Sequence, residues 1–261
     1  MTNTPRALVI RTAGTNCDAE MVRAFELAGA RVKLLHVDRL IAAPRRVDEF
    51  DLVGLPGGFS YGDDIASGRV LAIKLRDRLG EPLRRAVARG VPIIGVCNGF
   101  QALVQTGLLP GDREENAVAL AGNAGDRFID RWVGVDYPES RCVWTEGLQS
   151  KCAPAPGEAC VLPIAHGEGR FVASGAALDR LEDNGQIAVR YTDTVNGSMR
   201  SIAGICDETG LVFGLMPHPE RFASWLQHPS WTRLERAVLD TPTPGLAIFR
   251  NAVERIATAS V

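Results

Sequence analysis

Short, almost entirely apolar runs separated by stretches of helical periodicity fill the first part of this sequence, and they limit its possible folds more than any other feature. These runs lie at residues 7–11, 31–37, 51–55 and 91–96. Between the first two runs we expect a helix that Asp18 caps and Gly29 ends. Continuous apolar strands alternating with helices are typical of parallel strands buried on both faces. The pattern therefore predicts an α/β fold with an open, mostly parallel sheet and helices on both faces.

The second half of the chain has a different pattern. Residues 126–215 contain shorter segments of alternating polarity, including RFIDRWVGV, ACVLPIA and QIAVRY, which predict an antiparallel extension. After Pro244, apolar residues recur at helical spacing and predict a helix packed back onto the sheet. Because no linker or break in composition divides the chain, we expect a single domain over residues 1–261.

Composition excludes several classes of function. Lys plus Arg number 29 and Asp plus Glu 31, a net charge of −2, which argues against a nucleic-acid partner. No apolar stretch is long enough for a membrane span or a signal sequence, so we expect a cytoplasmic protein. The six cysteines form no CxxC pair, which argues against a zinc site and a disulfide framework, and no metal is expected.

The segment GVCNGFQ places Cys97 where a buried strand runs into a helix, with Gly95 and Gly99 on either side. Such a nucleophile elbow holds its central residue in a strained conformation and exposes it at the edge of the sheet. A helix N-terminus also favours the thiolate over the thiol. Cys97 is therefore the candidate nucleophile. The alternative is a buried cysteine that acts only as a small apolar residue.

The segment MPHPER supplies the candidate base. In an extended segment, residues two apart point to the same side, so Glu220 can hold one nitrogen of His218 and fix its tautomer. Cysteine, histidine and carboxylate would then form a catalytic triad. The alternative is that His218, which lies between two prolines, is an ordinary turn residue.

Two glycine-rich segments are candidates for binding. In LPGGFSYGDD, the amide of Gly58 can pair with that of Asn98 to bind an oxyanion, or the segment is simply a tight loop. The segment HGEG, which begins at His166, is expected to be a polar loop that recognises a small substrate, although a simple turn fits it equally well. His36 and His228 are expected to be structural or exposed.

Taken in order, the motifs LPGGFSYGDD, GVCNGFQ, AHGEGRF and MPHPERF resemble those of class I glutamine amidotransferases. Within that class they resemble the glutaminase-subunit family of phosphoribosylformylglycinamidine synthases. The resemblance extends from the TNCD stretch near residue 15 through the final helix. It implies a flavodoxin-like sheet and the hydrolysis of glutamine.

The resemblance also implies a role for each matching residue. Cys97 would attack the glutamine carboxamide, His218 would protonate the departing ammonia, and Glu220 would orient His218. Gly58 and Asn98 would supply the oxyanion amides. The residues implied to hold glutamine are Gln101, His166, Gly167 and Glu168.

The implied partners are a large ATP-dependent synthetase subunit, which receives the ammonia, and a small assembly subunit. ATP and magnesium would belong to the synthetase, with no cofactor in this chain. Residues 111–126 and 225–245 resemble the family less and are interpreted as polar insertions. Two other classes of function stay open: a peptidase or glyoxalase-like thiol hydrolase, and a binding domain with an inactive elbow.

Overall fold

The computed structural model describes residues 4–63, 66–111, 117–148 and 160–259. Its largest element is a nine-stranded sheet with the order β2-β1-β3-β4-β11-β10-β9-β6-β7. The first five strands in this order are mutually parallel. They are β2 (Arg31–His36), β1 (Arg6–Arg11), β3 (Leu52–Leu55), β4 (Ile93–Val96) and β11 (Val212–Leu215). The predicted open parallel sheet is therefore confirmed.

The other strands of the large sheet pair in antiparallel fashion. They are β10 (Ile202–Cys206), β9 (Ile187–Tyr191), β6 (Ile129–Asp136) and β7 (Cys160–His166). The predicted antiparallel extension is confirmed, with one refinement: β11 is antiparallel to β10 but parallel to β4, so it joins the two halves. A second, two-stranded sheet pairs β5 (Val118–Gly122) with β8 (Glu168–Ala173). The single-domain interpretation stays a prediction.

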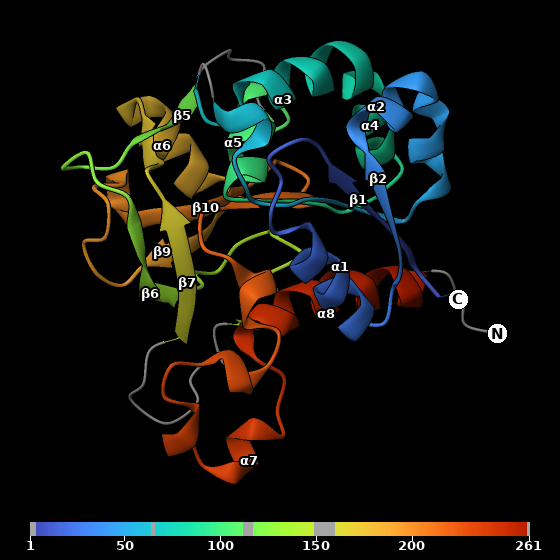
Figure 1. Ribbon diagram of the computed structural model, residues 1–261. Helices are drawn as coiled ribbons and strands as arrows, with labels where there is room; N and C mark the ends of the chain where they lie inside the picture. The colour runs from blue at the N-terminus through green and yellow to red at the C-terminus, as the bar shows by residue number, and fades with distance from the viewer. Residues whose placement is uncertain (1–3, 64–65, 112–116, 149–159, 260–261) are drawn as a thin grey trace.

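Helices cover both faces of the parallel half (Figure 1). The helices α1 (Asp18–Leu27) and α8 (Pro244–Ala259) lie on one face. On the other face lie α3 (Arg69–Lys74), α4 (Gly80–Ala88) and α5 (Asn98–Gln105), with α2 (Val37–Ala42) beside α4. The remaining α-helices of the described residues are α6 (Gly175–Asp183) and α7 (Arg236–Leu239), and short 3₁₀ and π helices lie between the elements.

The predicted cap of α1 is wrong. Cys17 occupies the N-cap position without a capping bond from its side chain, and Asp18 is already the first helical residue. The carboxylate of Asp18 lies 3.4 Å from Arg11 on the neighbouring strand. The side chain of Asp18 therefore interacts with β1, and the side chain of Cys17 turns toward the interior.

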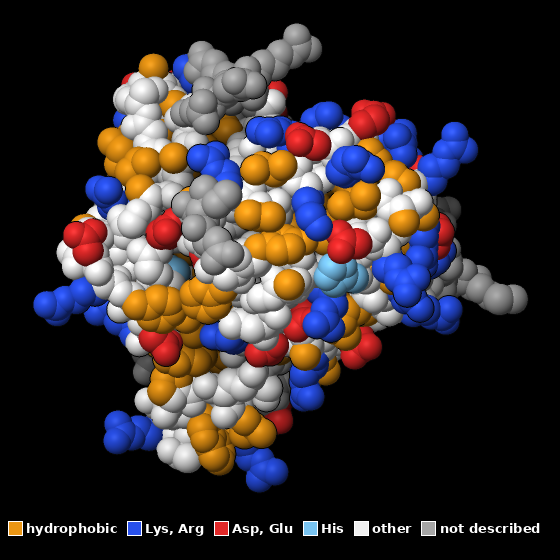
Figure 2. Space-filling model, turned by 45° about the horizontal axis from the view of Figure 1, so that its top comes forward, with side chains coloured by type: hydrophobic (Ala, Val, Ile, Leu, Met, Phe, Trp, Pro, Cys, Tyr) orange, Lys and Arg blue, Asp and Glu red, His pale blue; other side chains and the backbone are white. Residues whose placement is uncertain are grey.

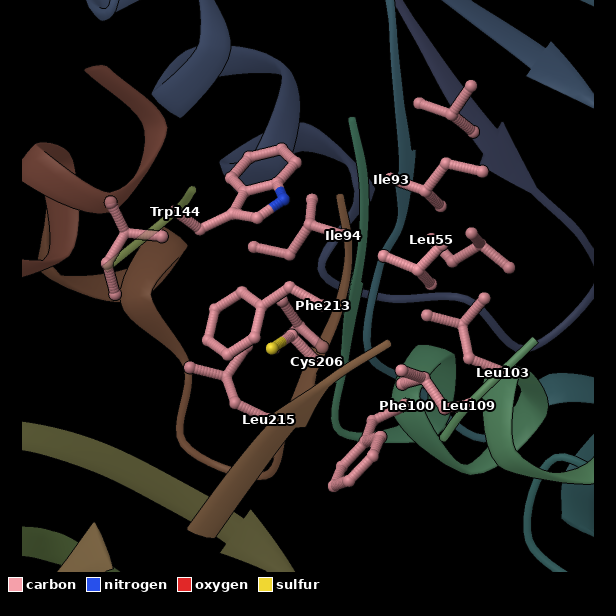
Figure 3. Packing of buried hydrophobic residues seen from close by; sticks show 14 of the residues in the cluster. Leu55, Ile93, Ile94, Phe100, Leu103, Leu109, Trp144, Cys206, Phe213 and Leu215 are labelled. Carbon is pink, nitrogen blue, oxygen red and sulfur yellow. The ribbon is translucent and has the colours of Figure 1, made fainter. Parts of the chain in front are cut away.

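The core lies between the sheet and its two helical layers (Figure 3). On one side, Trp144 packs against Phe213 of β11, with 6.5 Å between ring centroids, and against Phe249 of α8 at 6.4 Å. On the other side, Phe100 and Leu103 of α5 cover the central strands. Burying each such side chain stabilises the fold by about 2–3 kcal/mol. This packing fixes the strand ends on which the polar residues stand.

The two stretches interpreted as polar insertions differ from each other. Residues 118–122 form β5, an apolar VALAG segment that pairs with β8, so this part of 111–126 is not polar. That either stretch is an insertion stays a prediction. Residues 112–116 lie outside the described residues. Most of 225–245 projects from the body around α7 (Figure 1) and is attached through Trp225, whose ring lies 5.2 Å from Phe222. His228 packs among these rings, which confirms its structural role.

Within the described part of the chain, none of the helices has both the length and the apolar character needed to cross a membrane. On the face shown in Figure 2, Lys and Arg side chains are interspersed with Asp and Glu side chains and with hydrophobic patches.

Candidate active site

The predicted elbow is present at the end of β4. Cys97 has φ 50° and ψ −106°, a backbone conformation that costs a residue other than glycine about 1–3 kcal/mol. Glycine is required two residues later, because a Cβ on Gly99 would lie 2.0 Å from the carbonyl oxygen of Leu55. The amide of Cys97 donates to the carbonyl of Leu215 at 2.8 Å. The strained residue is therefore fixed by the neighbouring strand β11.

The thiol of Cys97 sits at the N-terminus of α5, but the prediction that the elbow exposes it is wrong: Cys97 is only 5% exposed, because the end of β7 lies against it. Its sulfur lies 3.9 Å from the carbonyl oxygen of Ala165, near the end of β7. The unpaired amides at a helix N-terminus favour negative charge on such a sulfur. The elbow thus brings a thiol from the parallel half against a strand of the antiparallel half.

His218 follows β11 and forms the other half of the reactive pair. Its Nδ1 lies 2.6 Å from Oε1 of Glu220, and both residues are 2% exposed. The predicted contact is confirmed, but the reason given for it was wrong. Residues Pro219–Phe222 form a 3₁₀ helix, so a turn, and not an extended segment, brings Glu220 back to the imidazole.

The electrostatics of His218 favour the protonated ring. Burial alone would lower its pKa, but the charge of Glu220 and contacts with the thiols of Cys17 and Cys97 raise the pKa well above its ordinary value. Because Nδ1 faces Glu220, the hydrogen on Nδ1 is directed at the carboxylate. Nε2 is buried without a hydrogen-bond partner among the described residues. That nitrogen is available to exchange a proton with a reacting group.

The glycine-rich turn after β3 lies beside the elbow, because Ser60 donates its amide to Oδ1 of Asn98 at 3.2 Å. Gly58 has φ 147°, and a Cβ there would lie 2.6 Å from the carbonyl oxygen of Gly14. Within the described residues, the amides of Gly58 and Asn98 donate no hydrogen bond to a main-chain carbonyl. Both are thus available as oxyanion donors.

Gln101 lies beside these residues, but the protein itself engages its side chain. Its Oε1 accepts from Nδ2 of Asn98 at 3.0 Å, and its Nε2 donates to the carbonyl of Glu168 at 2.5 Å. Asn98 also donates to Asp63, at 3.2 Å. Burial raises the pKa of Asp63 and the charge of Glu168 adds to it, against hydrogen bonds that lower it. Gln101 therefore ties α5 to the start of β8.

The segment HGEG is not the expected loop. His166 ends β7 and Glu168 begins β8, so only Gly167 lies between two strands that belong to different sheets. Glu168 turns back toward α3 and accepts from the amide of Ser67 at 3.3 Å. The segment is a sharp bend whose direction is set by strand pairing on both sides.

His166 is buried, and its hydrogen bonds fix its tautomer. Nδ2 of Asn123 donates to the carbonyls of Arg127 and His166, at 2.9 and 2.8 Å, which leaves Oδ1 of Asn123 to accept from Nδ1 of His166 at 3.0 Å. Burial, with repulsion from His218, lowers the pKa of His166 to about 4. Its Nε2 is then an unprotonated acceptor without a partner among the described residues.

Sequence reasoning missed two buried residues of this region. The sulfur of Cys17 lies 3.8 Å from Nδ1 of His218. The hydroxyl of Tyr191 has no hydrogen-bond partner among the described residues, and burial together with the charge of Cys97 raises the pKa of Tyr191 above its usual range. Cys17 lies in the TNCD stretch, which follows β1 after the turn at Gly14, and that position near a strand end was the available signal.

Ligand atoms of Cys17, His218 and Glu220 lie within 4.8 Å of one another, close enough to suggest a metal site. The 2.6 Å separation of nitrogen and oxygen in this group is that of a hydrogen bond. Two ligand atoms of one tetrahedral zinc ion stand more than about 3 Å apart. The cluster is therefore built to hold a proton between histidine and carboxylate.

An elbow thiol beside a buried histidine–carboxylate pair, at the ends of adjacent parallel strands, defines the class of thiol hydrolases with an α/β sheet. The comparison with protein families narrows this class. The model of the CobB/CobQ-like glutamine amidotransferase domain matches residues 4–255, and the chain belongs to this family.

The curated proteins most similar in sequence that were found belong to the same kind of enzyme subunit. The chain is 42% identical to "Phosphoribosylformylglycinamidine synthase subunit PurQ" of Dehalococcoides mccartyi, over 95% of this chain and 96% of the relative. It is 37% identical to the protein of the same name from Methanococcus maripaludis, over 96% of this chain and 97% of the relative.

Among solved structures, PurLQS from Thermotoga maritima matches with a TM-score of 0.73 and 33% identity, covering 97% of this chain and 99% of that chain. A glutamine amidotransferase from the same organism is 14% identical with a TM-score of 0.56, and this second likeness shows the fold alone.

Proposed function

We propose that this chain is the glutaminase subunit of a phosphoribosylformylglycinamidine synthase. It hydrolyses L-glutamine to glutamate and ammonia, and the ammonia is used in de novo purine biosynthesis to convert formylglycinamide ribonucleotide into formylglycinamidine ribonucleotide. The relatives' names and coverage support this assignment. The observation that carries the chemistry is the 2.6 Å contact between His218 and Glu220, placed beside the strained thiol of Cys97.

In the resting pair the proton of Cys97 lies on Nε2 of His218, and in the first step the resulting thiolate attacks the carboxamide carbon of glutamine. The carbonyl oxygen becomes an oxyanion that the amides of Gly58 and Asn98 bind, and each such donor contributes on the order of 3 kcal/mol. The imidazolium of His218 gives its Nε2 proton to the departing nitrogen, and the C–N bond breaks. Ammonia leaves, and a thioester joins the substrate to Cys97.

In the second step, neutral His218 takes a proton from water, and the resulting hydroxide attacks the thioester carbon. The C–S bond breaks, glutamate is released, and the sulfur and imidazole return to their starting forms. Glu220 keeps the Nδ1 hydrogen in place in both steps, so Nε2 always faces the reacting atoms.

Glutamine is held where the bend at Gly167 meets α5. His166 offers its unprotonated Nε2 to an N–H donor of the substrate, and Glu168 and the main chain of Gly167 line the same bend. Gln101 acts by holding this bend against α5 through its bond to the Glu168 carbonyl.

The ammonia passes to a large ATP-dependent synthetase subunit, and a small third subunit assists assembly. The solved relative PurLQS supports the existence of such a complex. ATP and magnesium are assigned to the synthetase. A cytoplasmic location fits this pathway and the free thiols of Cys17, Cys97, Cys142 and Cys206.

The test compares Cys97→Ala with the unchanged chain in the reconstituted synthase. We expect glutamine-dependent synthesis to fall by at least about a thousandfold, while synthesis from added ammonia is kept. Loss of both activities, or of neither, would contradict the proposal. A second experiment distinguishes a glutaminase from a peptidase or glyoxalase-like enzyme. The chain is incubated with a glutamine-like electrophile and its intact mass is measured. A glutaminase should be modified at Cys97, whereas the other two enzymes would leave Cys97 unmodified.

A further inference from the structure

The Nδ1 side of His218 has a second neighbour besides Glu220. The sulfur of Cys17 lies 3.8 Å from Nδ1, and Cys17 is 1% exposed. We propose that Cys17 is a positioning residue for His218: it holds the imidazole in the orientation that presents Nε2 to Cys97, and it stabilises the protonated ring. This inference rests on the proposed glutaminase function and adds a residue to it.

The direction of the Cys17 thiol follows from its other contact. The sulfur lies 3.2 Å from Oδ1 of Asn16, which can only accept, so the S–H points there. The lone pairs of the sulfur are then left for the N–H at Nδ1 of His218. The short bond from that N–H goes to Glu220, and the polarizable sulfur is a second, weaker acceptor on the same side.

The main chain of Cys17 makes this contact rigid. The amides of Asn16 and Cys17 both donate to the carbonyl of Gly57, at 3.3 Å each. A Cβ on Gly57 would lie 2.7 Å from Cε1 of His218 and 3.4 Å from the sulfur of Cys17, so ring, sulfur and turn are packed without spare room. Cys17 therefore connects the turn that carries Gly58 with the imidazole.

The titratable groups that face His218 come from four elements. They are Glu220 on the following 3₁₀ helix, Cys97 at the end of β4, Cys17 at the start of α1 and His166 at the end of β7. Of these, Glu220 and the two thiols favour the protonated imidazole, and His166 interacts with it repulsively. Removing Cys17 takes away one favourable contact, so His218 loses its proton at a lower pH.

The experiment uses the reconstituted synthase with Cys17→Ala, Cys17→Ser and the control Cys142→Ala. Cys142 is also 1% exposed but packs in the core against Cys206, away from the site. The glutamine-dependent kcat and KM are measured against pH, and the ammonia-dependent rate reports assembly.

For Cys17→Ala we expect kcat to fall about tenfold with little change in KM, because a misplaced proton donor slows the chemical step. The alkaline limb of kcat/KM should move to lower pH, since the protonated imidazole is lost earlier. Cys17→Ser, which keeps an acceptor for Nδ1, should recover most of the rate. Cys142→Ala should keep the pH profile of the unchanged chain.

A Cys17→Ala variant with the kcat and pH profile of the unchanged chain would overturn the inference, as would a loss matched by Cys142→Ala. If Cys17→Ala fails to assemble, Cys17→Val decides, because valine fills the space of the thiol but offers Nδ1 no acceptor: a kcat and an alkaline limb equal to those of the unchanged chain would overturn the inference. Failure of the unchanged synthase to use glutamine would instead overturn the proposed function.

Discussion

The parallel and antiparallel halves of the large sheet contribute to the site in different ways. The parallel half carries Cys97 and His218 after the ends of adjacent strands. The amide of Cys97 is fixed by the carbonyl of Leu215 on β11, and that of His218 by the carbonyl of Pro163 on β7. The antiparallel half contributes His166 and Tyr191, whose Nε2 and hydroxyl are buried without a partner among the described residues, as is Nε2 of His218 in the parallel half. Unpaired buried polar atoms are costly unless a ligand or water meets them.

This difference teaches which half performs which task. Groups that move protons and form bonds need a fixed geometry, and the parallel strands supply it. Groups that recognise a substrate can lack a hydrogen-bond partner in the free protein, because the substrate supplies the partner when it binds. Changes in the parallel half should therefore act mainly on kcat, and changes at His166 mainly on KM.

The largest effect is expected for Glu220→Gln. The amide keeps the shape of the carboxylate but loses the charge that favours protonated His218, and it can present the wrong hydrogen-bonding group to Nδ1. Glutamine-dependent kcat in the synthase should fall by roughly a thousandfold, with KM nearly unchanged. A kcat within tenfold of the unchanged chain would break the assignment of chemistry to the parallel half.

A smaller effect is expected on stability in acid. The pKa of His166 is lowered to about 4, so between pH 6.5 and 4 the unfolded chain binds a proton that the folded chain does not. Folding free energy is therefore lost as pH falls through this window, by about 3 kcal/mol in all from this group. His218 adds nothing there, because its raised pKa leaves it protonated in both states.

Urea unfolding at several pH values measures this loss. The His166→Asn variant should show a flatter dependence between pH 6.5 and 4, whatever its stability at neutral pH. His36→Asn is the matched control, since His36 ends β2 with its side chain 40% exposed. Equal pH dependence in the unchanged chain and in His166→Asn would show that His166 is not buried as a neutral ring.

The smallest effect is expected on substrate binding. His166→Asn removes the acceptor Nε2, and loss of one hydrogen bond to substrate should raise the glutamine KM about tenfold while kcat changes little. Initial rates at varied glutamine give both constants. If only kcat fell, His166 would take part in the chemical step. That result would contradict the division of tasks between the two halves of the sheet.

The sequence predicted the features that depend on residues close together in the chain. The elbow at Cys97 follows from glycines two residues away on each side, and the Glu220 contact from its position two residues after His218. The alternating apolar runs likewise predicted the parallel sheet and its antiparallel extension.

Features that depend on distant packing were missed. Cys17 contacts a histidine 201 residues away, and no local spacing records that meeting. The acceptor state of His166 depends on Asn123, which directly follows β5 and is 43 residues away in the sequence. Helix capping failed at Asp18 because Arg11, on the adjoining strand, competes for the carboxylate.

The bond from the Cys97 amide to the Leu215 carbonyl has a consequence for control of the enzyme. The register of β4 and β11 places Val96 beside Leu215, so the segments that carry Cys97 and His218 leave the sheet side by side. The amide of His218 is held in turn by the carbonyl of Pro163 on β7, at 2.8 Å. We expect a partner that regulates hydrolysis to act through the Gly57–Ser60 turn or the bend at Gly167. Such a partner would change how the oxyanion and the substrate are bound, while the positions of Cys97 and His218 relative to each other stay the same.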